Sequence, residues 1–124
     1  MKKLSNGNRE GKREYLNLGF IPYEKFSQSV SRTLEYSYDD WTVTRLAKDL
    51  SEADYHLYNQ RGQFYRNLYD ETTGFMRPKS SDYQWLDSFD PMMASNHVTE
   101  GNAYQYSLFV PQDIEGLIGL MGGY

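Results

Sequence analysis

Cysteine is absent from the 124 residues of this chain. This absence excludes disulfide bonds and metal sites with thiolate ligands, and it leaves the cellular compartment open. Long apolar runs are absent as well, so we expect no transmembrane span. Residues 1–4 contain the lysines with which an export signal can begin, but the polar residues 5–10 follow them. We therefore expect no signal peptide in this chain.

An excess of positive charge is also lacking, because the formal net charge is −4. A nucleic acid is therefore disfavoured as a partner, since its phosphates must be neutralised by basic residues. The basic residues of the first 14 positions are diluted by acidic and polar ones. We interpret residues 1–14 as a disordered leader.

The chain is rich in aromatic residues, and twelve of them are tyrosines. Tyrosine offers a stacking face with a polar edge, which suits sugar rings, but it also occupies half-buried positions between packed helices. Both interpretations stay open at this point. The length fits one domain with a modest core.

Helical periodicity dominates the first half of the chain. Apolar residues recur at helical spacing between Tyr23 and Leu50, which predicts one long helix after Pro22. Ser51 then has the character of an N-cap, with Asp54 three residues later, and the pattern continues to about Tyr69. Because the connection is short, the two helices should be antiparallel neighbours.

Residues 70–100 lose this periodicity and predict a long irregular loop, which begins with a turn at residues 70–74. Three aromatic residues in the loop need a place to pack, which argues against plain disorder: Phe75, Trp85 and Phe89. A short helix is expected over 102–109 and another after Asp113. No segment alternates like a strand. The predicted class is therefore all-α, built from helical hairpins with one long irregular loop.

Several polar residues are candidates for chemistry. Glu100 lies where the irregular segment enters an aromatic helix, so it could serve as a proton donor or as a helix N-terminal acid. Arg77 could bind a ligand hydroxyl or pair with Asp82, Asp87 or Asp90. We predict substrate-binding roles for Arg77, His97, Asn102 and Gln105.

Three further polar residues are better explained by structural than by chemical roles. Asp39 and Asp40 are adjacent on a helix, so their side chains diverge by about 100° and cannot easily share one ligand. We expect one to face solvent and the other to bond a neighbouring segment. His56 is isolated among polar residues and is expected at the surface. No spacing of histidine and carboxylate residues marks a metal site.

A series of short motifs then occurs in a fixed order. The motifs are residues 29–41 (SVSRTLEYSYDDW), 73–77 (TGFMR), 89–91 (FDP), 99–106 (TEGNAYQY) and 110–113 (VPQD), followed by Glu115-Gly116-Leu117. Together they resemble the catalytic domain of glycoside hydrolase family 92, the calcium-dependent exo-α-mannosidases, from about Tyr15 to Gly123.

The resemblance implies a fold, an activity and a partner. It implies that residues 15–124 are a fragment of an α/α toroid, and that the parent protein is an inverting enzyme acting on α-mannoside glycans. Glu100 corresponds to the general acid of the family. The catalytic base and the calcium ligands lie in family motifs beyond this chain, so we expect no metal ligands here and no activity from the isolated chain. Gln112 and Tyr104 stand where the family often has His and Trp.

The resemblance also bears on the location of the parent protein, and one alternative function stays open. By analogy the parent protein is secreted or periplasmic. A fragment cut from a toroid should expose helical faces through which it can self-associate. The alternative to an enzyme fragment is a non-catalytic carbohydrate-binding or helical interaction module.

Overall fold

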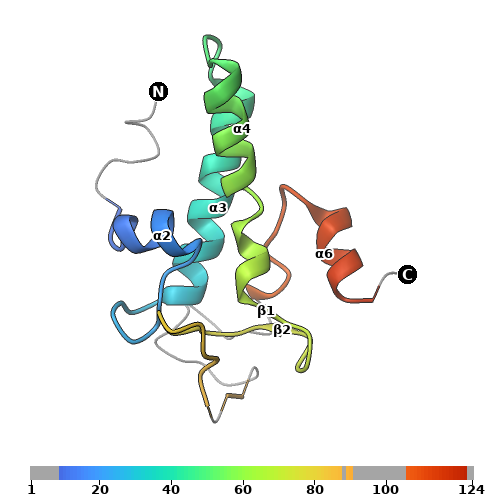
Figure 1. The fold of residues 1–124 in the computed structure, drawn as a ribbon. Helices are drawn as coiled ribbons and strands as arrows, with labels where there is room; N and C mark the ends of the chain where they lie inside the picture. Colours follow the sequence, from blue (N-terminus) through green and yellow to red (C-terminus); the bar gives the residue numbers. More distant parts are fainter. Residues whose placement is uncertain (1–8, 88, 91–105, 123–124) are drawn as a thin grey trace.

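The computed structural model describes residues 9–87, 89–90 and 106–122 (Figure 1). Over these residues the fold is mostly helical, which confirms the helical part of the prediction. Its elements, labelled as in Figure 1, are α2 Lys12–Leu18, α3 Ser29–Leu46, α4 Glu52–Arg61, the 3-10 helix η1 Phe64–Leu68, β1 Tyr69–Asp70, β2 Phe75–Met76 and α6 Ile114–Leu120.

The α3–α4 pair forms the central hairpin and confirms the predicted antiparallel neighbours (Figure 1). Residues 47–51 connect the two helices. The hydroxyl of Ser51 accepts a hydrogen bond from the Asp54 backbone N–H at 3.1 Å, as the capping pattern predicted. Farther along the hairpin, the Ser37 hydroxyl donates to the Arg61 carbonyl oxygen at 2.9 Å.

The predicted bounds of these helices were too wide. Helix α3 begins at Ser29, because Gln28 adopts a left-handed conformation with φ of 55° and the preceding residues form turns. It ends at Leu46, whose side chain is 79% exposed, so the apolar stripe does not continue to Leu50. Helix α4 ends at Arg61. The rest of the predicted second helix contains the separate η1, and Tyr69 at its end begins β1.

The two short strands correct the expectation that the chain contains no strand. Tyr69 pairs with Met76 and Asp70 with Phe75 in an antiparallel register. Gly74, with φ of 78°, provides the left-handed turn residue between them. Strands of two residues are too short to show an alternating pattern, so sequence periodicity could not reveal them.

The predicted irregular segment is therefore partly ordered where it is described. After β2, Lys79 and Trp85 form an antiparallel bridge, and the Lys79 ammonium group lies 4.3 Å from the centre of the Trp85 ring. Of the three aromatic residues expected to need packing, Trp85 lies against Lys79, Phe89 lies against the Arg77 guanidinium, and Phe75 is half-buried in β2.

Helix α2 begins inside the segment interpreted as a leader, at Lys12. It is bounded by Gly11 and Gly19, which both have left-handed φ values. The Asn67 side-chain amide donates to the Gly19 carbonyl oxygen at 2.8 Å and so connects the end of α2 to η1.

The hydrophobic core lies where the hairpin meets η1, the strands and α6. Its buried members are Phe20, Val30, Leu34, Tyr65, Leu68, Tyr69, Met76, Val110 and Leu117. The side chains of Tyr15, Tyr58 and Tyr65 are fully buried, so several tyrosines occupy core positions. This packing places the β1–β2 hairpin beside the C-terminal segment.

Candidate functional site

Arg77 is the predicted site residue that the structure describes, and its guanidinium group has three partners. Nη1 donates to Asp70 Oδ2 at 3.0 Å. Nε and Nη2 both donate to the Leu86 carbonyl oxygen, at 2.9 and 2.5 Å. The group also lies 5.4 Å from the centre of the Phe89 ring. The ion pair is thus with Asp70, which the sequence had marked only as part of a turn.

Asp70 is built into the start of the hairpin turn. It is 3% exposed and also accepts a hydrogen bond from the Thr72 backbone N–H at 3.0 Å. Burial by itself raises the pKa of this carboxyl, but the hydrogen bonds from Arg77, Thr72 and Thr73 outweigh burial and hold the pKa below its usual value. Asp70 is therefore an ionised partner for Arg77 at neutral pH.

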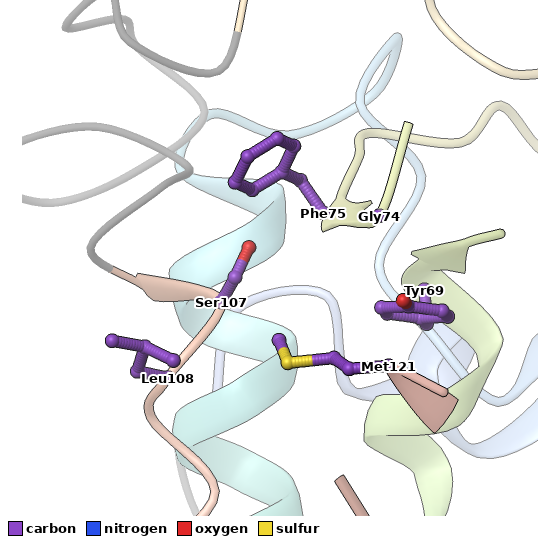
Figure 2. Close-up of a pocket in the computed structure, with 6 residues that line it drawn as sticks. All are labelled: Tyr69, Gly74, Phe75, Ser107, Leu108 and Met121. Carbon is purple, nitrogen blue, oxygen red and sulfur yellow. The ribbon is translucent and has the colours of Figure 1, made fainter. Parts of the chain in front are cut away.

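A cavity of about 260 Å³ opens beside the hairpin. Figure 2 shows side chains from three segments around it: Tyr69, Gly74 and Phe75 from the hairpin, Ser107 and Leu108, and Met121 after α6. The described residues of the lining are mostly apolar and include no carboxylate. They therefore offer packing surface and supply no acid or base for hydrolysis.

Ser107 joins the C-terminal segment to β2. Its side chain is 1% exposed, and its Oγ accepts a hydrogen bond from the Met76 backbone N–H at 2.8 Å. Sequence analysis did not single out Ser107 or Asp70. The one available signal for Asp70 was its position seven residues before Arg77 across a glycine turn.

Asp113 organises the start of α6. Its Oδ1 accepts from the Gly116 backbone N–H at 3.0 Å, and its Oδ2 accepts from the Tyr65 hydroxyl at 2.7 Å and from Arg66 Nη2 at 3.2 Å. Burial raises the pKa of Asp113, but hydrogen bonds led by the one from Tyr65 lower it overall. Burial and the same carboxylate raise the pKa of Tyr65.

Gln112, which stands where the resemblance implies a frequent His, contacts the central hairpin. Its Nε2 donates to the Gly62 carbonyl oxygen at 3.0 Å and to Ser37 Oγ at 3.3 Å. Its Oε1 is buried and has no hydrogen-bond partner among the described residues. The amide thus holds the segment before α6 against both helices of the hairpin.

Four other predicted site residues lie outside the described residues: Glu100, His97, Asn102 and Gln105. The helix predicted over 102–109 also begins outside them, and its described residues 107–109 form a turn instead of a helix. The catalytic role of Glu100 and the substrate contacts of all the predicted binding residues therefore remain predictions.

The adjacent carboxylates have the separate environments that the helix geometry predicted. Asp39 is exposed, whereas Asp40 is fully buried, accepts from the Tyr15 hydroxyl at 3.0 Å and pairs with Arg9 Nη2 at 3.0 Å. His56 lies at the surface, as expected. Among the described residues, no group of three or more histidine, aspartate or glutamate side chains could hold a metal ion.

Comparison with known proteins identifies the class to which this helical chain belongs. It is a piece of a glycoside hydrolase catalytic domain: residues 1–124 match the "Glycosyl hydrolase family 92 catalytic domain". The chain therefore belongs to glycoside hydrolase family 92, as the motifs indicated.

Solved structures agree in sequence and fold. A family GH92 inverting mannosidase from Bacteroides thetaiotaomicron is 38% identical, with a TM-score of 0.89 over 93% of this chain. A family GH92 α-mannosidase from the same bacterium is 39% identical, with a TM-score of 0.88 over 94% of this chain. That α-mannosidase has also been solved in complex with mannoimidazole.

A curated relative extends the comparison to a fungus. It is an "Uncharacterized secreted glycosidase" of Arthroderma benhamiae, 29% identical over 93% of this chain. The chain spans 19% of that relative's length and 16% of each solved mannosidase chain. None of the described helices has the length and apolar character needed to cross a membrane.

Proposed function

We propose that this chain forms part of an inverting exo-α-mannosidase that hydrolyses terminal α-mannosides of glycans. The observation that carries the proposal is the combination of family membership with close structural likeness to a solved inverting mannosidase. On this proposal the chain from α2 onward contributes helical hairpins to an α/α toroid.

Glu100 is the general acid in this proposal. An inverting glycosidase uses one carboxylic acid to protonate the leaving-group oxygen and one carboxylate to activate water, with the two about 6.5–9.5 Å apart. Glu100 supplies the first group, and the second belongs to a part of the family domain that this chain does not include. The isolated chain should therefore be inactive.

Calcium is part of the family's chemistry by resemblance, and the described residues do not fit it, because they contain no group of three or more histidine, aspartate or glutamate side chains that could hold a metal ion. In line with the family's motifs, we place the calcium ligands in the remaining part of the parent domain. His97, Asn102 and Gln105 are proposed to contact the sugar. Arg77 stays a candidate, although its nitrogen atoms already serve Asp70 and Leu86.

A chimera tests the acid role. The chain would replace the matching segment of the inverting mannosidase from Bacteroides thetaiotaomicron, and aryl α-mannosides with good and poor leaving groups would be compared. Glu100→Gln should lower kcat/KM roughly 10²–10⁴-fold for a poor leaving group and much less for a good one. Glu115→Gln, an exposed carboxylate on α6, is the matched control and should have little effect.

Equal losses with both leaving groups would contradict the acid role. The isolated chain should show no turnover of an aryl α-mannoside. Turnover that Glu100→Gln abolishes would show that the chain is complete enough to act alone.

The location and assembly of the parent protein complete the proposal. We place the parent outside the cytoplasm, as a secreted or periplasmic protein, in line with its fungal relative, which is described as a secreted glycosidase. The isolated chain should self-associate through apolar side chains that it exposes.

A further inference from the structure

One exposed aromatic residue has a strained backbone. Tyr83 has a φ of 64°, in the left-handed region, and its side chain is 59% exposed. A residue with a bulky side chain seldom adopts this conformation, whereas glycine or asparagine adopts it at lower cost. Because the side chain is mostly exposed, burial does not explain why a tyrosine occupies this position. Strain of this kind points to a role for the side chain itself.

The loop that presents Tyr83 follows β2 and is held by its own hydrogen bonds (Figure 1). The Ser80 backbone N–H donates to the Gln84 carbonyl oxygen at 2.8 Å, and the Ser80 carbonyl oxygen accepts from the Tyr83 N–H at 2.8 Å. The Ser80 hydroxyl also accepts from the Gln84 N–H at 3.2 Å. From outside the loop, the Glu24 carboxylate accepts from the Ser81 N–H at 3.1 Å. The Tyr83 ring is thus carried on a fixed backbone, which reduces the entropy lost when a ligand binds.

Tyr83 shares a packing partner with an ammonium group that has unused donors. The Tyr83 ring lies against Phe20, with the ring centres 5.9 Å apart and the planes at 68°. The Lys79 Nζ atom lies 5.5 Å from the centre of the Phe20 ring and 4.3 Å from the centre of the Trp85 ring. Among the described residues, none pairs with this ammonium group or accepts a hydrogen bond from it. Its three N–H donors are therefore available to an oxygen atom of a ligand.

The chemistry of these groups suits a neutral sugar. A tyrosine ring offers an apolar face for the C–H side of a pyranose, and its hydroxyl offers a polar edge. Asp82 and Gln84, both exposed, flank Tyr83 and can bond sugar hydroxyls. The carboxylates of Asp82 and Glu24, together with the net charge of −4, disfavour an anionic ligand.

We propose that residues 79–85 form a binding site for a sugar ring of a neutral glycan, on which Tyr83 stacks and to which the Lys79 ammonium group donates a hydrogen bond. The choice of an α-mannoside as the ligand rests on the proposed function. The site contributes affinity for the glycan and takes no part in proton transfer.

Titration of the full chain with an α-linked mannotetraose, followed by amide NMR spectroscopy, tests the site. The amide signals of residues 79–85 should shift and reach saturation. Tyr83→Asn removes the ring and tolerates the left-handed backbone, and it should raise the dissociation constant about tenfold or more. Lys79→Met removes the N–H donors but keeps an apolar stem, and it should raise the dissociation constant about threefold. Tyr83→Phe keeps the ring and should stay within about threefold of the wild type.

Two controls separate binding from folding. Tyr55→Asn makes the same substitution at a tyrosine of α4 that is 38% exposed, and it should leave the dissociation constant unchanged. The urea midpoint of Tyr83→Asn should equal or exceed that of the wild type, because asparagine relieves the strain at this position. A lower midpoint would show that the ring is kept for packing on Phe20, and it would overturn the proposal.

The absence of saturable shifts at residues 79–85, or an unchanged dissociation constant in Tyr83→Asn, would also overturn it. The titration measures binding without turnover, so its outcome does not depend on whether Glu100 protonates a leaving group. The leaving-group comparison in the chimera can therefore succeed while the sugar site fails, and the sugar site can be confirmed while the acid role fails.

Discussion

At the scale of single residues, Gly116 in the first turn of α6 lies so close to the capping residue Asp113 that a side chain has no room there. A Cβ atom added at Gly116 would overlap Asp113 Oδ2 and Arg66 Nη2, the two groups that already bond to each other. Gly116→Ala should therefore lower the free energy of unfolding by roughly 1–3 kcal/mol. Urea denaturation followed by circular dichroism measures this change.

Gly119 provides the matched control on the same helix. A Cβ atom there would meet nothing within 4 Å. Gly119→Ala should raise the free energy of unfolding by up to about 1 kcal/mol, because alanine has the higher helix propensity. If both substitutions had the same sign, the fit around Asp113 would not be what requires glycine at 116.

Asp70 should make the stability of the chain depend on acidity. Its pKa is below the ordinary value when the chain is folded, so its stabilising contribution is present above the unfolded pKa of about 3.9 and is lost as the pH falls through the folded pKa. The difference in unfolding free energy between wild type and Asp70→Asn should therefore be full near pH 7 and shrink below about pH 4. Urea melts across this range measure it.

Asp87→Asn removes the same charge from an exposed position and serves as the control for the pH series. The difference in unfolding free energy between Asp87→Asn and wild type should stay small at every pH. A constant difference for Asp70→Asn would show that the Arg77–Asp70 pair is not the source of the acid sensitivity.

At the scale of whole elements, the buried Tyr15 at the middle of α2 is held to α3 by one carboxylate. Asp40 bonds the Tyr15 hydroxyl of α2 and pairs with Arg9, while its neighbour Asp39 faces solvent. Asp40→Ala should cost about 3–5 kcal/mol, because it leaves a buried arginine without its partner. Asp39→Ala should change stability by no more than about 0.5 kcal/mol. Thermal melts of the two variants compare them directly.

Equal losses of stability in Asp40→Ala and Asp39→Ala would contradict the role of Asp40 in holding α2 to α3.

Burial raises the pKa of Tyr15, and the Asp40 carboxylate raises it further. Tyr15 is therefore protonated at neutral pH and donates to Asp40.

Elements with local signals could be predicted from the sequence, and elements set by tertiary contacts could not. The Ser51 cap, the antiparallel hairpin and the helix after Asp113 each follow from a residue at a defined position. The start of α3 depends on a left-handed Gln28, a residue type that gives no such signal. The two-residue strands exist because residues 69–70 and 75–76 pair with each other.

The candidate site likewise has residues that the sequence could reveal and partners that only the folded chain reveals. The motif containing Arg77 could be recognised, but its partners Asp70 and Leu86 depend on how the chain folds back after β2. Ser107 is one serine among many in the sequence, and its importance comes from the Met76 N–H opposite it.

At the scale of the whole molecule, apolar side chains are exposed along the C-terminal segment. Leu108 is 64% exposed, Ile114 60% and Met121 39%, and Leu108 and Met121 also line the cavity beside the hairpin. In the solved mannosidases the matching segment is 16% of the chain, so much more protein is present there to cover such surfaces. An isolated chain has only other copies of itself with which to bury them.

We therefore expect the weight-average mass in sedimentation equilibrium to rise above 14.6 kDa with increasing concentration. Leu108→Asp should restore the monomer mass, because it places a charge at the rim of the cavity. Leu46→Asp, at the end of α3 and 79% exposed, is the matched control and should leave association unchanged. A monomer mass at all concentrations would contradict self-association. If Leu46→Asp restored the monomer mass and Leu108→Asp did not, the self-association surface would instead lie at the tip of the α3–α4 hairpin.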